Sequence, residues 1–180
     1  MAKKDRHVII AYFKGADKAD MAANQLKAWD KATDAIKLGG IGILTWQKDK
    51  IHTRKVGTRA AGTGAKWGVI LGAATGILSG GVTLIGGAVA GVAGGAVAGA
   101  LFHKSLGLSD DDKDRLEEHL QQGGAAVVVM ADEDEVEPTQ AELTGLGGQV
   151  EDYKVPEETM SQVEEATDVQ PVEEGDSGTA

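Results

Sequence analysis

The side chains that could carry chemistry are few and lie far apart in this chain. The sequence has no cysteine, which excludes a disulfide scaffold, a thiolate zinc site and a cysteine nucleophile. No serine lies in a nucleophile-elbow pattern, and the histidines show neither His-x-x-x-His nor His-Glu-x-x-His spacing. These histidines are His7, His52, His103 and His119. The sequence therefore predicts no catalytic residue, no metal site and no cofactor.

One glycine-rich stretch is the strongest candidate for a phosphate-binding loop. Residues 62–68 read GTGAKWG and lie between a predicted strand and a predicted helix. The Walker pattern requires Ser or Thr after its lysine, but Lys66 is followed by Trp67. The dinucleotide pattern fails by one residue at Gly68, and no acidic residue follows at the usual distance of about 20 residues. These glycines are therefore interpreted as the start of a longer glycine-rich segment, and no small-molecule substrate is predicted.

The electrical charge is divided along the chain. The 180 residues suit one domain with appendages, and they carry a formal net charge of -10. Residues 1–66 hold 14 Lys and Arg against 6 Asp and Glu, whereas residues 105–180 hold 3 against 22. A protein that is acidic overall binds phosphate backbones poorly, so no nucleic-acid partner is predicted.

Hydrophobic patterning predicts an α+β domain interrupted by a long insertion. The expected strands are residues 7–14, 41–48, 50–56 and 125–131, and the expected helices are residues 17–35 and 109–122, with Ser109 as an N-cap. A short helix over residues 138–146 and an edge strand over residues 149–155 follow. This βαββαβ order is typical of a ferredoxin-like sandwich, in which two helices cover one face of an antiparallel sheet.

Periodicity and composition also predict the buried face of the first helix and the domain organisation. Apolar side chains at three- to four-residue spacing are expected to face the sheet: Met21, Ala22, Leu26, Trp29, Ala32 and Ile36. The two halves of the ferredoxin-like domain are expected at residues 1–59 and 105–155, with the insertion at residues 60–104. Residues 156–180 have 8 acidic residues and no Lys or Arg, which predicts a disordered acidic tail.

The insertion carries the most informative pattern. Residues 67–102 have no charged side chain and consist of 11 Gly, 8 Ala, 3 Ser or Thr and 14 larger apolar residues. Glycine recurs at every fourth position in two series: Gly64, Gly68, Gly72, Gly76 and Gly80, then Gly87, Gly91, Gly95 and Gly99. Each series lies on one face of an α-helix, where a glycine costs about 1 kcal/mol unless close helix packing compensates. The pattern predicts a glycine-zipper helical hairpin that self-associates.

The residues around this hairpin are typical of a membrane interface. Cations and aromatic residues flank the uncharged run: Arg59, Lys66, Trp67, Phe102 and Lys104. The two predicted helices would reach about 21 Å and about 30 Å, against a hydrocarbon thickness of about 30 Å. Four interpretations remain open, namely a membrane-inserted hairpin, a re-entrant or interfacial hairpin, a hairpin buried by homo-oligomerisation in water, and a flexible loop.

Several sequence blocks together resemble a known group of proteins. They are VIIAYF, ILTWQKDKI, the Gly/Ala zipper, SDDDKDRLEEHLQQGGAAVVVM and GGQVEDY, over about residues 7–155. This arrangement resembles a bacterial family of uncharacterised predicted membrane proteins, in which a split ferredoxin-like domain carries an inserted glycine-zipper hairpin. The resemblance implies a bacterial source and membrane association, and it implies no activity, cofactor or catalytic residue.

The expected function is therefore that of a non-enzymatic, membrane-associated protein. It would self-associate through the glycine-zipper hairpin, with its ferredoxin-like domain on the cytoplasmic side of the bacterial inner membrane. The expected partners are a second copy of the chain and the lipid bilayer. The alternative is a soluble, cytoplasmic scaffold protein whose hairpins pack against one another in a homo-oligomer.

Overall fold

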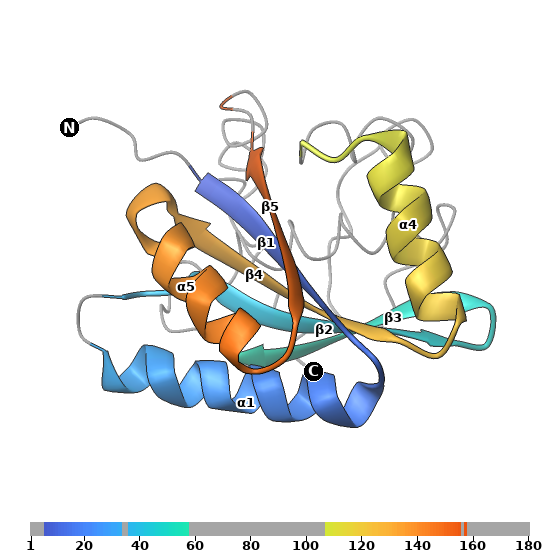
Figure 1. Ribbon diagram of the computed structural model, residues 1–180, viewed down its shortest axis with the longest axis horizontal. Coiled ribbons are helices and arrows are strands. Elements are labelled where there is room, and N and C mark those ends of the chain that lie inside the picture. The colour runs from blue at the N-terminus through green and yellow to red at the C-terminus, as the bar shows by residue number, and fades with distance from the viewer. Residues whose placement is uncertain (1–5, 34–35, 58–106, 156, 158–180) are drawn as a thin grey trace, which may run out of the picture.

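The computed structural model describes residues 6–33, 36–57, 107–155 and 157 (Figure 1). These residues form five strands and three helices. In chain order they are β1 (Arg6–Phe13), α1 (Ala16–Ala32), β2 (Gly40–Gln47), β3 (Lys50–Gly57), α4 (Asp110–Gln121), β4 (Ala125–Asp132), α5 (Glu133–Gly145) and β5 (Gln149–Val155). The strands make one antiparallel sheet in the order β3-β2-β4-β1-β5, which confirms the α+β class.

Strand β4 is the centre of the sheet. Its sequence AAVVVMAD is apolar at nearly every position, and it pairs with β1 on one side and β2 on the other. Alternate residues of a strand point to opposite faces, so a continuous apolar run can be buried on both faces only if both are covered. All residues from Ala125 to Ala131 are buried, and the strand predicted over residues 125–131 is confirmed.

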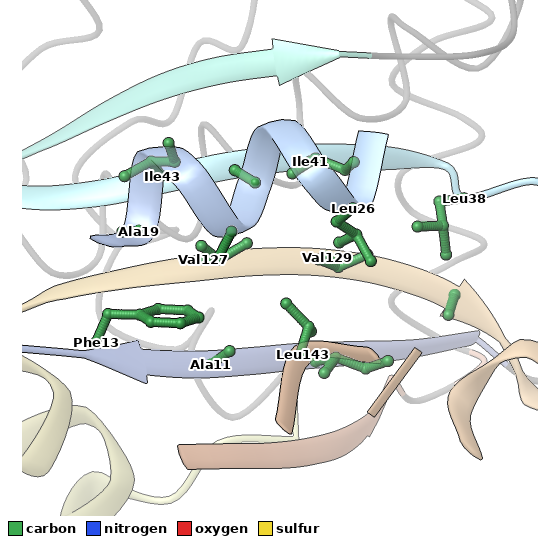
Figure 2. Close-up of a cluster of buried hydrophobic side chains, with 14 of the residues drawn as sticks. Ala11, Phe13, Ala19, Leu26, Leu38, Ile41, Ile43, Val127, Val129 and Leu143 are labelled. Carbon is green, nitrogen blue, oxygen red and sulfur yellow. The ribbon is translucent and has the colours of Figure 1, made fainter. Parts of the chain in front are cut away.

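Helices α1 and α5 cover one face of the sheet (Figure 1). Figure 2 shows Leu26 of α1 above Val129, and Leu143 of α5 close to β1. Helix α1 packs small residues, chiefly alanines, against the strands, and this lets it lie close to the sheet. Ala19, Leu26 and Leu143 have no exposed surface, so the layer between these helices and the sheet is a buried hydrophobic core.

Helix α4 covers the opposite face, where Leu116 and Leu120 pack with Ile10 and Val128. The predicted arrangement placed residues 109–122 beside the first helix on one face. That placement is wrong, because α5 takes the position next to α1 and α4 lies across the sheet from it. The physical reason is that β4 and β1 present apolar side chains on both faces, so each face requires its own helix.

Two helix predictions need correction in detail. Met21 is 64% exposed and Ala32 is exposed, because the buried stripe of α1 runs through Ala19, Ala22, Ala23, Leu26 and Asp30. Helix α5 begins at Glu133 and not at Pro138, since Asp132 and Glu135 form a capping box one turn earlier and the proline is accommodated inside the helix. In contrast, Ser109 is the N-cap of α4 as predicted.

The two points at which the chain leaves and re-enters the described fold lie at the same end of the sheet. Gly57, the last residue of β3, pairs with Ile41 near the start of β2. Gly107 lies against β5 near its last residue, because a Cβ at Gly107 would be 2.5 Å from the main-chain oxygen of Lys154. The register places the beginning of β1 and the ends of β4 and β5 at this same end, since Arg6 pairs with Asp132 and with Val155.

The residues predicted to self-associate or to contact a membrane lie outside the described residues. They are Gly64, Gly68, Gly72, Gly76, Gly80, Gly87, Gly91, Gly95 and Gly99, together with Arg59, Lys66, Trp67, Phe102 and Lys104. The predicted hairpin at residues 60–104 and almost all of the predicted tail also lie outside them. Among the helices that are described, none combines the length and the apolar character needed to cross a membrane.

Candidate functional site: a polar cluster under helix α4

Five polar side chains meet between α4 and the strands β1 and β5. Figure 1 shows α4 on the side of the sheet away from α1. The members of this polar cluster come from three elements: Tyr12 from β1, Asp112 and Arg115 from α4, and Glu151 and Tyr153 from β5. Residues 151 and 153 are two apart in a strand and therefore share a face. The β1–β5 register pairs Tyr12 with Gln149 on that same face, two residues from Glu151.

Arg115 and Glu151 hold the cluster together. The Nη2 of Arg115 donates to Asp112 Oδ1 at 2.6 Å, while its Nη1 donates to Glu151 Oε1. The hydroxyl of Tyr153 donates to the other Glu151 oxygen, Oε2, at 2.7 Å. Both oxygens of Glu151 are thus occupied, and charge-assisted bonds of this kind are stronger than bonds between neutral groups.

Asp112 joins the cluster to the N-terminus of α4. Its Oδ2 accepts the main-chain NH of Ser109 at 2.9 Å and the Ser109 hydroxyl at 2.6 Å. Partial burial alone would raise the pKa of Asp112, but the hydrogen bonds from Ser109 and the positive charge of Arg115 outweigh it and lower the pKa below 3.8. Asp112 is therefore ionised at neutral pH, as a capping carboxylate at a helix N-terminus should be.

The two tyrosines have pKa values raised well above the ordinary 10.0. Burial is the largest cause in both, and the nearby negative charge of Glu151 adds to it. Both hydroxyls consequently keep their protons at neutral pH. The hydroxyl of Tyr12 is buried, and among the described residues it has no partner in hydrogen-bonding geometry, although Glu151 lies near enough to affect its pKa.

His119 anchors the other end of α4. Its Nε2 lies 2.8 Å from the main-chain oxygen of Phe13, and its ring meets the ring of Tyr12 edge to face with centroids 5.2 Å apart. Because a carbonyl oxygen can only accept, the proton in this bond belongs to Nε2. Helix α4 is thus fixed to β5 at its first turns and to β1 at its last turn.

The chemistry open to this cluster is hydrogen bonding, and its evident effect is to fasten α4 to the sheet. Protonated tyrosines and a carboxylate already bonded to arginine are not poised to exchange a proton at neutral pH. Over residues 6–33, 36–57 and 107–155, no three His, Asp or Glu side chains converge as a metal site would require.

The described histidines lie apart from one another, as their spacing in the sequence predicts, whereas the sequence did not predict the polar cluster. His7 Nδ1 lies 3.3 Å from Asp152 Oδ2, His52 is exposed on β3, and His103 is outside the described residues. The structure brings none of the predicted site residues together, because none of them is described. The polar cluster was missed, although the Glu-x-Tyr spacing at residues 151 and 153 signals two polar groups on one strand face. Which strand would lie beside them depends on long-range pairing.

A family model described as "Protein of unknown function (DUF1269)" matches residues 61–168, which is more than half of the chain. This match confirms the expectation of an uncharacterised protein family. No curated protein and no solved structure matches the chain.

Proposed function

The chain belongs to the DUF1269 family, and we propose that it is a non-enzymatic, membrane-associated protein that self-associates through a glycine-zipper hairpin. Residues 60–104 would form the hairpin, and the domain of five strands and three helices would lie against the membrane on the cytoplasmic side of a bacterial inner membrane.

The observation that carries this proposal is the combination of an uncharged segment with the position of its attachment points. Residues 67–102 contain no charged side chain, and the chain leaves at Gly57 and returns at Gly107 at one end of the sheet. A helical hairpin needs both of its open ends on the same side. The two sheet edges are four strand spacings apart, roughly 19 Å, which a few extended residues at each end of the hairpin can bridge.

The glycine series supplies the proposed means of association. Nine glycines at four-residue spacing would leave two helix faces without side chains, so that helices can approach closely enough for dispersion and Cα–H···O contacts. Arg59, Lys66, Trp67, Phe102 and Lys104 would lie at the level of the lipid headgroups, since they flank the uncharged run on both sides.

We also infer that the domain is ferredoxin-like in its core, with two additions. The units β1-α1-β2 and β4-α5-β5 would be its two halves, because their strands lie in the order β2-β4-β1-β5 and their helices share one face. Strand β3 would then extend the sheet at one edge, and α4 would cover the second face.

Fractionation of native cell lysate tests the proposal. The membrane pellet is washed with carbonate and then with detergent, and the fraction that holds the protein is sized. We expect the protein to resist carbonate, to leave the pellet only in detergent and to run as an oligomer. Release of a monomer by carbonate would contradict both membrane insertion and self-association.

A soluble scaffold protein is the second candidate, and the low hydrophobicity of residues 67–102 favours it. Of the uncharged residues 67–102, 11 are Gly and 8 are Ala, which contribute little to insertion in lipid. In that case the same lysate would yield a large, uniform cytoplasmic particle without detergent, and the glycine faces would bind other copies of the hairpin.

A further inference from the structure

We propose that one flank of the domain binds anionic lipid headgroups and sets its orientation on the membrane. This basic flank is the β3 edge of the domain with the adjoining side of α1, and its cations are Lys27 and Lys31 on α1 and Arg54 and Lys55 on β3. Arg54 lies on the sheet face that α1 covers, whereas Lys55 lies on the other face of this edge strand, so the flank extends around the edge. The inference rests on the proposed membrane association and names the lipid class that the domain contacts. The sequence places Arg54 and Lys55 just before the insertion, whereas only the fold brings Lys27 and Lys31 of α1 next to them.

The geometry places Lys27 at the point where the chain enters the insertion. Its Nζ donates to the main-chain oxygen of Val56 at 2.9 Å, and its Cε would lie 3.1 Å from a Cβ at Gly57. Lys31 lies one helical turn further, exposed in the last turn of α1. Residues four apart on a helix share a face, so both lysines line the same side of α1.

The flank keeps a net positive charge because its four cations outnumber Asp20 and Asp30, the two acidic side chains of α1 that lie beside them. Asp20 pairs with Arg54 across α1 and β3. Asp30 is buried, and its Oδ1 accepts the main-chain NH of Leu38 at 2.9 Å. Lys27 bonds to a neutral carbonyl, and Lys55 is exposed near the end of β3.

At the end of the sheet where Gly57 and Gly107 lie, two helices begin with acidic side chains. The first turn of α4 carries Asp110, Asp111 and Asp112, and the first turn of α5 carries Glu133, Asp134 and Glu135. Asp112 of α4 is joined through Arg115 to Glu151 of β5, at the edge away from β3, whereas Glu135 of α5 accepts the main-chain NH of Lys37 just before β2. An anionic surface would attract one edge and repel the other, so the domain would tilt with β3 toward the headgroups.

The chemistry favours a lipid surface over a nucleic acid. The basic flank leads directly through Arg59 and Lys66 into the uncharged run, and cations beside an apolar segment are the juxtamembrane pattern. A nucleic-acid groove would need a longer basic track or exposed aromatic side chains for stacking. On the same face of β3, the side chains on either side of Arg54 are the uncharged His52 and Val56, so the basic track does not continue along this strand.

Vesicle co-sedimentation of the full chain tests the inference. One set of vesicles contains phosphatidylcholine alone, and the other contains phosphatidylcholine with anionic phosphatidylglycerol, each at low and high salt. The double variant Lys31→Gln/Lys55→Gln removes two exposed cations from the flank. The matched control Lys14→Gln/Lys18→Gln removes two exposed cations at the opposite end of the sheet.

We expect the unmodified chain to bind anionic vesicles more tightly than neutral ones, and salt to weaken this preference. The flank variant loses two headgroup contacts, so it should bind anionic vesicles roughly tenfold or more weakly. The control should change binding less than about twofold. Thermal melting of both variants verifies that they are folded.

Three outcomes would overturn the inference. Equal binding to both vesicle types would reject the basic flank and leave the inserted hairpin standing, whereas binding to neither would reject both proposals. Equal losses in the flank variant and the control would show a general charge effect. A loss confined to binding of a duplex RNA probe, with vesicle binding unchanged, would reassign the flank to nucleic acid.

Discussion

The Nε2 of His119 lies 2.8 Å from the main-chain oxygen of Phe13, and this contact joins the last turn of α4 to the last residue of β1. Directly beneath it the chain turns at Gly124, whose NH bonds the main-chain oxygen of His119 at 3.1 Å. A Cβ at Gly124 would lie 2.3 Å from His119 Nε2 and 2.6 Å from the His119 oxygen. The close approach of α4 to β1 therefore depends on a residue without a side chain.

Gly124→Ala should destabilise the fold. The new methyl group would displace both the imidazole and the helix backbone, and overpacking of this kind costs roughly 1–3 kcal/mol. Denaturant unfolding measures the change. Gly145→Ala is the matched control, because nothing lies within 4 Å of its added Cβ, and it should be neutral or slightly stabilising. Equal losses in the two variants would contradict the steric explanation.

Leu26→Ala should lower the free energy of unfolding by about 2–5 kcal/mol. Leu26 has no exposed surface and packs between α1 and the strands that α1 covers (Figure 2). Met21 on the same helix is 64% exposed, so Met21→Ala should change stability by less than about 0.5 kcal/mol. Similar values for both variants would mean that α1 does not cover the sheet through Leu26.

The two tyrosines of the polar cluster should respond differently to loss of their hydroxyls. Tyr12→Phe removes a buried hydroxyl that has no hydrogen-bond partner among the described residues, so it should be neutral or stabilising. Tyr153→Phe removes the 2.7 Å bond to Glu151 and should cost roughly 1 kcal/mol. Thermal or denaturant unfolding compares them, and a larger loss in Tyr12→Phe would reveal a partner that this geometry lacks.

Stability should decline at alkaline pH through these same tyrosines. Burial raises the pKa of Tyr12 and of Tyr153 above 10.0 in the folded state. Their contribution is complete below the unfolded pKa of 10.0 and is lost as the pH rises above it, because the unfolded chain then releases protons that the folded chain retains. The double variant Tyr12→Phe/Tyr153→Phe should show a shallower decline above pH 10. An unchanged pH profile would refute this linkage.

Leucine on the predicted glycine faces should disrupt self-association and leave the domain folded. Gly72→Leu and Gly91→Leu would place bulk where two helices are proposed to touch, and the oligomer should become smaller on sizing in detergent. Ala74→Leu and Ala93→Leu are matched controls, since residues two positions away lie on another helix face. Oligomers of unchanged size in the glycine variants would refute the zipper.

The sequence by itself determined the local features of this fold. The run AAVVVMA predicted a strand over residues 125–131, and the register of β4 between β1 and β2 confirms it. Ser109 predicted a helix start, and the structure shows it as the N-cap in a capping box with Asp112. These features depend on residues within a few positions of one another, so local propensity and periodicity suffice to predict them. The glycine series belongs to the same class of evidence, and its structure remains a prediction.

Only the tertiary structure decided which distant residues meet. Periodicity showed that residues 109–122 form an amphipathic helix, but it could not tell which sheet face the helix would cover. The pairing of β5 with β1 brings Glu151 beside Tyr12, and the packing of α1 beside β3 brings Lys27 to Val56. Both contacts join residues far apart in the chain, and their formation depends on strand order and helix placement, which are set by burial of the whole apolar surface.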